Sequence, residues 1–454
     1  MIRRPTQLPP RNRERGVTMI LVVLAMLSML GIIALAIDVI TLYSARSETQ
    51  RAADAAALAA AKMLVDMGVT TDPTATVPTA AQIDAATKAA QSVAVNATIA
   101  GRQVQTGDVT LTFPGQSTPA FSINPKVSVT VQNTNLPTFF SRIWSGAALT
   151  VRASATAEGF NPSNSSSIAG GSGVPVVARC VKPFIVPNCD PQHAGAGCSG
   201  TGDTFFDLGT GAITHPGVAP AGIIGEGFDL VSTCGPGPGC APGTPTVGPG
   251  PGGPTLYYYP AQLPPATNAC PSCAGGGTNF QQDIECCNPT PISCGTAVIA
   301  PVVNQLWLDD TVFPEGGGGP AQDGTQCLIH QSGGSGQDTL LSGPPLTYPL
   351  QIEVGGNHPL AGTVLSANNL VTTSDSLVTI PVYDPIGPPP TPTSATPVRV
   401  IGFLQVFIDQ VFPGGGGPKA GEFHVTVVNV SGCGSSASGT PVLSGSAVPV
   451  RLIQ

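Results

Sequence analysis

The residues with the clearest chemical potential are cysteines in the middle of the chain. Cys270 and Cys273 are separated by two residues, the adjacent pair Cys286 and Cys287 follows, and Cys294 comes shortly after. Zinc is often held by two Cys-x-x-Cys knuckles, and a reduced Cys-x-x-Cys can act as a redox dithiol. Only one knuckle is present, and adjacent cysteines are awkward ligands for one ion. Structural disulfides are therefore the preferred interpretation.

The cysteines as a set indicate an oxidising compartment. There are 12 of them, and none precedes residue 180. An even number of cysteines outside the cytoplasm is typical of a disulfide framework, although the pairings cannot be derived from sequence. Proximity suggests a Cys234–Cys240 pair and a local group of Cys180, Cys189 and Cys198. The disulfide candidates are Cys180, Cys189, Cys198, Cys234, Cys240, Cys270, Cys273, Cys286, Cys287, Cys294, Cys327 and Cys433.

Histidines and glycine-rich segments give no catalytic or ligand-binding pattern. No His-x-x-x-His pair occurs among the 5 histidines, and His215 and His358 precede prolines, which favours turns. The Gly/Pro run at 235–239 is not a phosphate loop, because proline lacks the amide donor that a phosphate needs. We therefore expect no catalytic residues, no cofactor, no metal and no enzymatic activity.

An apolar segment near the N-terminus must position everything that follows it. Residues 17–37 carry no charge. At about 1.5 Å per residue they would span roughly the 30 Å hydrocarbon core of a bilayer. The segment continues without proline into an alanine-rich stretch that ends near residue 67. The pattern predicts one long helix, half inside a membrane and half outside it.

Charge fixes the expected direction of this span. Residues 1–16 hold five arginines and one glutamate, a net charge of +4. The whole chain has a net charge of −8, so the remainder carries −12. A basic arm beside an apolar span is the positive-inside signature. It predicts a single-pass inner-membrane protein with a cytoplasmic N-terminus and the bulk of the chain in the periplasm. A nucleic-acid partner would need a basic patch on the large domain, and none is evident.

The rest of the chain predicts an α+β module followed by a β domain. A second helix is expected over 80–100, ended by Gly101, and strands over 104–113, 126–131 and 148–157 form a small antiparallel sheet. Gly (56 residues) and Pro (47 residues) then interrupt short β-like runs, so the second part is expected to be all-β, disulfide-rich and Gly/Pro-rich. The predicted organisation is a basic cytoplasmic arm (1–16), a transmembrane helix (17–37), a helix-plus-sheet module (38–159), a linker (160–175) and an extracytoplasmic β domain (176–454).

Several of these segments resemble a known family. Arg15-Gly16, the span ending at Asp38, and residues 50–61 (Gln-Arg-Ala-Ala-Asp-Ala-Ala-Ala-Leu-Ala-Ala-Ala) resemble the N-terminal signature of the TadE/TadG-like proteins of Tad (Flp) pilus assembly. Segments 137–142 and 151–157 are also similar to that family, so that the resemblance covers roughly residues 15–159. It implies a membrane-anchored, non-enzymatic component of pilus assembly or surface attachment. Its implied partners are the inner membrane and other pilus-assembly or pilin-like subunits, without a nucleic acid or small-molecule substrate.

The alanine-rich half of the helix is a candidate docking face. Gln50, Asp54 and Leu58 lie one turn apart on one side of the predicted helix, and small neighbours allow close approach of another helix. The alternative is that the alanine face packs on the protein's own sheet.

Two positions could be processed. Gly16 follows Arg15 as at a prepilin cleavage site, and Ala36 closes an Ala-x-Ala pattern like that of a secretory signal. An uncut anchor is the preferred interpretation. Cleavage after Ala36 would instead release a secreted protein, so the alternative function is a secreted or surface-anchored adhesin or binding protein with a disulfide-stapled β domain.

Overall fold

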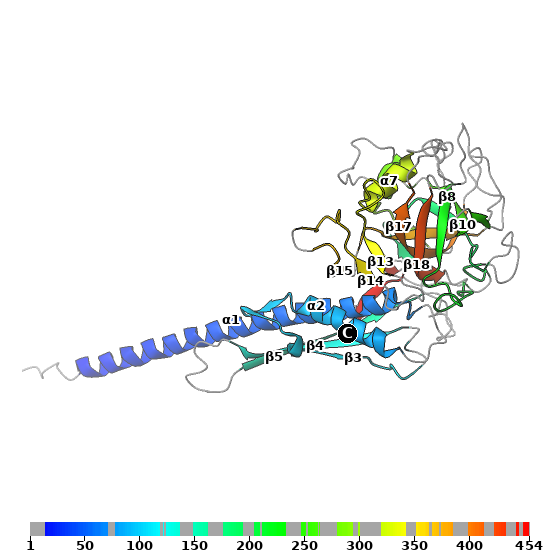
Figure 1. Cartoon of the computed structure of the whole chain (residues 1–454). Helices are drawn as coiled ribbons and strands as arrows, with labels where there is room; N and C mark the ends of the chain where they lie inside the picture. The colour runs from blue at the N-terminus through cyan, green and yellow to red at the C-terminus, as the bar shows by residue number, and fades with distance from the viewer. Residues whose placement is uncertain are drawn as a thin grey trace, which may run out of the picture. The chain divides into compact units, whose positions relative to one another are not determined.

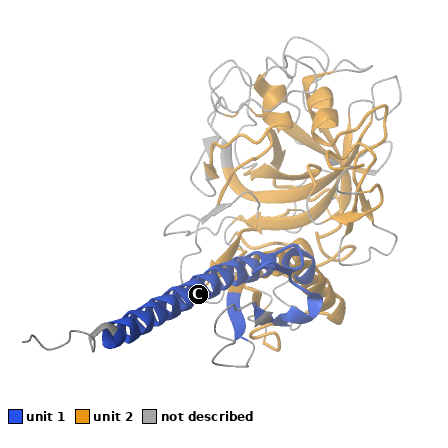
Figure 2. Cartoon of the chain, turned by 90° about the vertical axis from the view of Figure 1, so that its left-hand side faces the viewer, with its two compact units in different colours: residues 1–56, 91–111, 129–155 blue, residues 57–90, 112–128, 156–454 orange. Residues whose placement is uncertain are grey.

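A computed structural model describes the chain in two compact units. The described residues are 14–70, 78–118, 121, 124–136, 149–161, 176–193, 204–208, 211–232, 247–250, 253–261, 263, 279–293, 298–299, 319–341, 351–362, 366–371, 374–384, 398–412, 422–432, 442–444 and 448–453. One unit comprises residues 1–56, 91–111 and 129–155, and the other comprises residues 57–90, 112–128 and 156–454 (Figure 2).

The predicted long helix is confirmed as α1 (Glu14–Asp66), which is uninterrupted (Figure 1). Apolar and then alanine-rich sequence without proline explains its length. It stops where Gly68 takes a left-handed φ of +71° and donates its N–H to the carbonyl of Val65. The first turns are exposed on all sides, whereas from Ala34 onward one stripe is buried. That stripe comprises Ala34, Asp38, Ala45, Thr49, Ala52, Ala53, Ala56, Ala57, Ala60, Ala61 and Leu64.

The second predicted helix is shorter than expected. It is α2 (Ala80–Ala94), and the chain then forms a hairpin of β1 (Thr98–Ile99) and β2 (Arg102–Gln103). Ala100 and Gly101 occupy the hairpin turn with φ of 49° and 81°. Two consecutive positive φ values match a primed hairpin turn. Gly101 is therefore a turn residue, and its prediction as a helix cap was wrong.

The small antiparallel sheet contains four strands in the order β20-β5-β4-β3. Their bounds are β3 (Val109–Thr112), β4 (Lys126–Leu136), β5 (Leu149–Gly159) and β20 (Val450–Ile453), and a 3-10 turn, η1 (Thr106–Asp108), precedes β3. Three strands were predicted. The fourth comes from the end of the chain, where Arg451 pairs with Glu158 at 2.6 Å. The short helical turn predicted near residue 140 lies outside the described residues.

The centre of the other unit is a closed six-stranded barrel (Figure 1). Its staves are β7 (Phe184–Pro187), β8 (Gly227–Ser232), β10 (Gly253–Pro260), β16 (Leu377–Tyr383), β17 (Val398–Val411) and β18 (Phe423–Gly432). Around the ring the order is β17-β16-β7-β10-β8-β18, and β18 pairs with β17 to close it. The pairs β7–β16 and β8–β10 are parallel, and the other four are antiparallel.

Strand alternation fills the barrel core. Alternate residues of the staves join one buried apolar cluster, as a barrel with inward and outward side chains requires, and the alternation shifts at the irregularities of β17 and β18. The members from the staves include Phe184, Val186, Phe228, Leu230, Leu256, Tyr258, Val378, Ile380, Val382, Leu404, Val406, Ile408, Phe423, Val425 and Val427.

The barrel unit also contains helices, so the all-β prediction was wrong in that respect. α6 (Asn279–Glu285) and α7 (Pro320–Leu328) contribute Phe280, Ile284 and Ala321 to the barrel core. Pro320 sits at the first helical position, a start signal that the sequence reading missed. Two short strands extend the barrel sheet, β9 (Val247–Gly250) beside β10 and β12 (Val298–Ile299) beside β17. A three-stranded sheet contains β6 (Val176–Ala178), β11 (Ile292–Ser293) and β19 (Val442–Ser444). Another contains β13 (Thr339–Leu341), β14 (Gln351–Glu353) and β15 (Leu370–Val371).

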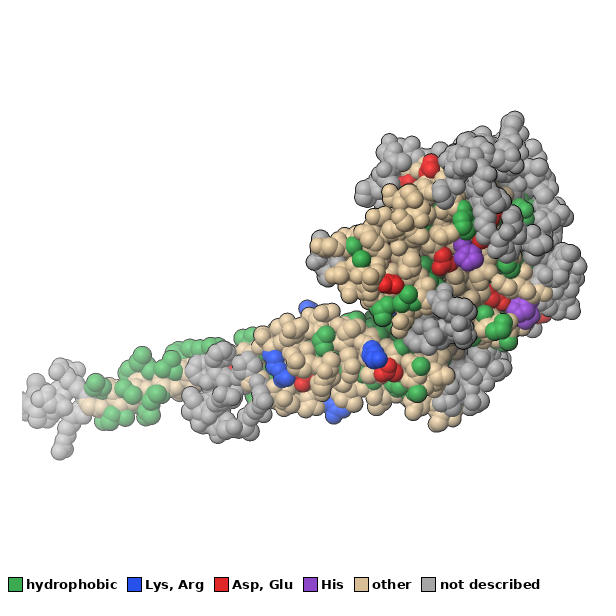
Figure 3. Space-filling view, in the orientation of Figure 1, with side chains coloured by type: hydrophobic (Ala, Val, Ile, Leu, Met, Phe, Trp, Pro, Cys, Tyr) green, Lys and Arg blue, Asp and Glu red, His purple; other side chains and the backbone are tan. Residues whose placement is uncertain are grey.

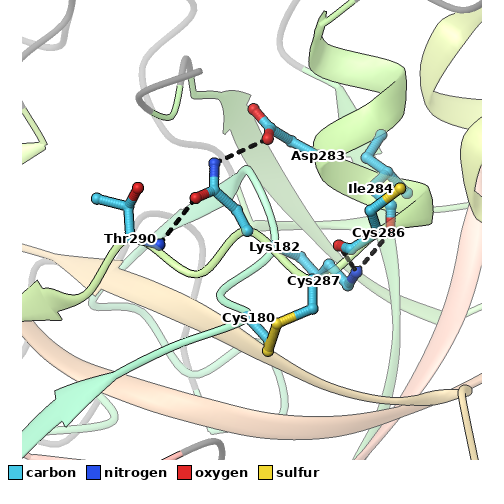
Figure 4. The surroundings of a disulfide bond; sticks show 8 residues. Cys180, Lys182, Asp283, Ile284, Cys286, Cys287 and Thr290 are labelled. Atoms are coloured by element: carbon cyan, nitrogen blue, oxygen red, sulfur yellow. Dashed lines mark hydrogen bonds between the residues drawn. A yellow bond between two sulfur atoms is a disulfide. The ribbon is translucent and has the colours of Figure 1, made fainter. Parts of the chain in front are cut away.

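Disulfides are confirmed for the described cysteines. Cys180 pairs with Cys287 across 107 positions of sequence, with their Cα atoms 4.3 Å apart (Figure 4). The place of Cys180 in the local group suggested by proximity was therefore wrong, and Cys287 is not available to a metal. Cys189, Cys286 and Cys327 are also disulfide-bonded. The remaining candidates (Cys198, Cys234, Cys240, Cys270, Cys273, Cys294 and Cys433) lie outside the described residues.

A buried lysine lies beside this disulfide. The ammonium of Lys182 donates to the carbonyls of Ile284 at 2.5 Å and Cys286 at 2.8 Å (Figure 4). These carbonyls are at the C-terminal end of α6, where a cation is favoured by the helix dipole. Burial lowers the pKa of Lys182 to about 8, although the negative charge of Asp283 opposes the change. Cys180 and Lys182 together hold the end of α6 against the segment before β7.

The tight packing of Phe206 against Gly402 in the barrel wall predicts that a larger residue at position 402 lowers stability. A Cβ at Gly402 of β17 would overlap the ring of Phe206, which is fully buried. We expect Gly402→Ala to lower the free energy of unfolding by about 1–3 kcal/mol, the usual range for overpacking. Thermal unfolding of the full chain in detergent measures this. Gly356→Ala is the control, because nothing lies within 4 Å of a Cβ there. Equal midpoints for the two variants would contradict the packing argument.

Lys182 predicts a pH dependence of stability. Its ordinary pKa is 10.5 and its folded-state pKa is about 8, so between these pH values the unfolded chain binds a proton that the folded chain has released. Raising the pH from 8 to 10.5 should therefore favour the folded state, by at most about 3 kcal/mol. Denaturant unfolding of the full chain at both pH values, compared with Lys182→Met, measures the difference. An identical pH slope in the variant would show that Lys182 does not contribute.

Candidate functional site

The first half of α1 presents a continuous apolar surface. Large apolar side chains between Val17 and Ile33 are 49–72% exposed, and hydrophobic atoms line this part of the helix in Figure 3. Within the described residues, this is the one helix long and apolar enough to cross a membrane. Because one face is buried from Ala34 onward, the part exposed on all sides is residues 16–33. Its length of about 27 Å at 1.5 Å per residue is close to the thickness of a bilayer core.

The predicted docking residues lie at the edge of the buried stripe. Gln50 is exposed, and Asp54 and Leu58 are half-buried. The amide of Gln50 donates to the Asp54 carboxylate at 2.7 Å and to the backbone carbonyl of Ser154 on β5 at 3.3 Å. The buried positions of the helix are mostly alanines. The alanine face is thus taken up by packing, while Gln50, Asp54 and Leu58 border the exposed side.

The predicted processing positions both lie inside α1. Gly16 is in the first turn, with nothing within 4 Å of a Cβ placed there. Ala36 is exposed and lies far from either end of the helix. Cleavage at either position stays a prediction.

A cluster of ionisable side chains in the barrel unit was missed by the sequence reading. Nδ1 of His193 lies 2.9 Å from Oδ2 of Asp190, and Nδ1 of His215 lies 3.2 Å from the same oxygen. The two imidazoles are stacked, with ring centroids 3.8 Å apart. Asp190 is fully buried. Asp190, His193 and His215 form a group whose ligand atoms all lie within 4.8 Å of one another, the arrangement of a possible metal site.

Glu226 adjoins this cluster. Its Oε1 lies 3.1 Å from Nδ1 of His193, which is closer, at 2.9 Å, to Oδ2 of Asp190. Neither oxygen of Glu226 accepts a hydrogen bond from a described residue. The side chain is 2% exposed. Burial, and then the neighbouring Asp190 carboxylate, raise the pKa of Glu226 to about 9.

Little in the sequence points to this group. Asp190 and His193 are three residues apart in a turn in which the Asp190 carboxylate accepts the backbone N–H of Gln192. Such an Asp-x-x-His spacing is a weak local signal. His215 and Glu226 join it only through the barrel topology.

The comparison with known proteins concerns α1. No curated protein and no solved structure matches the chain significantly. Residues 16–63 match the family described as putative Flp pilus-assembly TadE/G-like. The matched segment covers the exposed apolar turns of α1 and most of its buried stripe, including Gln50, Asp54 and Leu58. The resemblance predicted from sequence is thus confirmed for this segment, which fits a membrane-anchored pilus component.

Proposed function

We propose that the chain is a non-enzymatic component of Tad-type pilus assembly or surface attachment, anchored in the inner membrane by α1. The observation that carries the proposal is the change in burial along α1, within the segment that matches the family. Residues 16–33 are apolar and exposed on all sides, and the helix continues unbroken into a stripe buried by the protein itself. An isolated apolar surface of this length is stable in lipid, where a helix satisfies its own backbone hydrogen bonds.

The direction of the span follows from charge. The basic arm precedes α1, and the disulfides Cys180–Cys287 and those of Cys189, Cys286 and Cys327 lie after it. The positive-inside rule places the arm in the cytoplasm, and disulfides persist on the oxidising side. Both considerations support a periplasmic location for the barrel.

Partner binding is assigned to the exposed border of α1. Gln50 and Asp54 form a hydrogen-bonded pair at the edge of the alanine stripe, and Leu58 adds an apolar group one turn further along. Polar pairs of this kind set the register of helix contacts, and the apolar neighbour contributes buried area. Other pilus-assembly or pilin-like subunits are the proposed partners.

The anchor can be tested by placing charge within it. Leu24→Arg with Leu27→Arg puts two cations near the middle of the exposed apolar turns, at about 3 kcal/mol each. We expect the full chain to stay with the membrane after high-salt and alkaline washes and the double variant to be largely lost from it. Ile40→Arg with Tyr43→Arg is the control, because both residues are exposed but lie beyond residue 33. Recovery of the unaltered chain in the medium would favour the adhesin function instead.

The docking residues predict a specific loss of partner contact. Asp54→Leu removes the acceptor for Gln50, and we expect it to lower crosslinking to pilus-assembly subunits by about fivefold, as a loss of about 1 kcal/mol would. Asp84→Leu on α2 is the control, since Asp84 is an exposed helical aspartate that likewise pairs with a side chain four residues away, Lys88 at 2.7 Å. Crosslinking in membranes followed by identification of the partners measures both variants. Unchanged crosslinking of Asp54→Leu would remove this surface from the proposal.

A further inference from the structure

We propose that Asp190, His193, His215 and Glu226 bind a divalent transition-metal cation of the zinc class. The site is separate from α1, and the inference does not depend on the proposed function. Two imidazole nitrogens and two carboxylate oxygens are a donor set that zinc accepts readily. Imidazole donors disfavour magnesium and calcium, which prefer oxygen ligands.

The spacing of the donor atoms suits one ion once the two stacked imidazoles turn toward it. Metal–ligand bonds of about 2.0–2.1 Å in a tetrahedral site put neighbouring ligand atoms about 3.3 Å apart. The distances from Asp190 Oδ2 to the two imidazole nitrogens are 2.9 and 3.2 Å, and Glu226 Oε1 lies 3.1 Å from His193 Nδ1. Asp190, His193 and His215 thus form the core of the ligand set, and Glu226 completes it.

Hydrogen bonding alone explains only part of the cluster. The carboxylate of Asp190 accepts from the backbone N–H of Gln192 and lies within hydrogen-bond distance of both imidazoles. Glu226 is buried and accepts no hydrogen bond from the described residues. Two neighbouring buried carboxyl groups, Glu226 and Asp190, are costly unless a proton or a cation lies between them. A cation between the two would supply the missing partner.

The three segments that carry the ligands are held in place independently. The Asn188 side chain pairs with both backbone groups of Phe206, donating to its carbonyl at 2.8 Å and accepting its N–H at 2.9 Å. The Gln192 side chain donates to the carbonyl of Gly227 at 2.7 Å, next to Glu226. Outer contacts of this kind orient metal ligands before the ion binds.

A cation can reach the site from solvent through the two histidines. The side chains of His193 and His215 are each 22% exposed, whereas Asp190 and Glu226 are buried behind them. A bound ion would link the turn after β7, the loop that contains His215 and the start of β8. Its expected role is therefore to stabilise the barrel at the end of β7.

The test is a titration of the full chain with Zn²⁺. The protein, purified in detergent with a tag that lacks histidine, is stripped with EDTA without reductant and titrated calorimetrically. We expect one strong site per chain. His215→Gln should abolish it, and Glu226→Gln should weaken it by about 10–100-fold. His330→Gln should bind as the unaltered chain does, because His330 pairs with Asp375 at 3.0 Å outside this cluster.

Two further readouts keep the proposal testable if a variant folds poorly. Zn²⁺, but not Ca²⁺, should raise the thermal midpoint of the unaltered chain. Bound Co²⁺ should give a four-coordinate visible spectrum without thiolate-to-cobalt absorption. The proposal is overturned by less than half an equivalent of bound Zn²⁺, by equal losses in His215→Gln and His330→Gln, or by a thiolate absorption.

Discussion

Closure of the barrel depends on its shortest stave. β7 shares only two residue pairs with β10 and two with β16, whereas β17 and β18 pair along most of their length. Prolines at Pro187 and Pro260 occupy ends of these short ladders and cannot donate a backbone hydrogen bond. The apolar side chains of Phe184 and Val186 are nevertheless fully buried. The ring can therefore close only if the residues on both sides of β7 are held by other contacts.

Those contacts occupy both flanks of β7. Before the strand, the Cys180–Cys287 disulfide and the Lys182 ammonium attach the chain to the end of α6. After it, Asn188 pairs with Phe206, and the Asp190 carboxylate meets two imidazoles. Apart from Asp190 and His193, which are three positions apart, these contacts join residues 18 or more positions apart. The Cys180–Cys287 bond also restricts the unfolded chain, because it closes a long covalent loop. Directional polar groups and a covalent bond thus replace the long hydrogen-bonded ladder that β7 lacks.

The sequence predicted those elements whose pattern is local. The uncharged run after Gly16 and the alanines after Asp38 predicted α1, and short β-like runs between glycines and prolines predicted the strands of the second part. The β7–β16 and β8–β18 pairs of the barrel, the return of β20 to β5 and the Cys180–Cys287 bond were not predictable, because they join positions more than a hundred residues apart. The approach of His215 to Asp190, 25 positions away, was hidden because it depends on the fold of the loops between the strands. The prediction for Gly101 failed for a different reason. A glycine is typical of helix ends and of hairpin turns alike, and here it belongs to a hairpin turn.

Along α1 the backbone stays the same while its surroundings change. A helix satisfies its backbone hydrogen bonds internally, so it can leave lipid and enter a protein environment without a break. Small side chains suit both sides of that transition, because alanine loses no side-chain entropy and lets neighbouring backbone approach closely. A stripe of alanines buries little area per residue, so firm packing requires many consecutive turns, which explains why the stripe extends from Ala34 to Leu64. Gln50 and Asp54 lie at the edge of this stripe, where the Gln50 amide also donates to the backbone carbonyl of Ser154 at 3.3 Å.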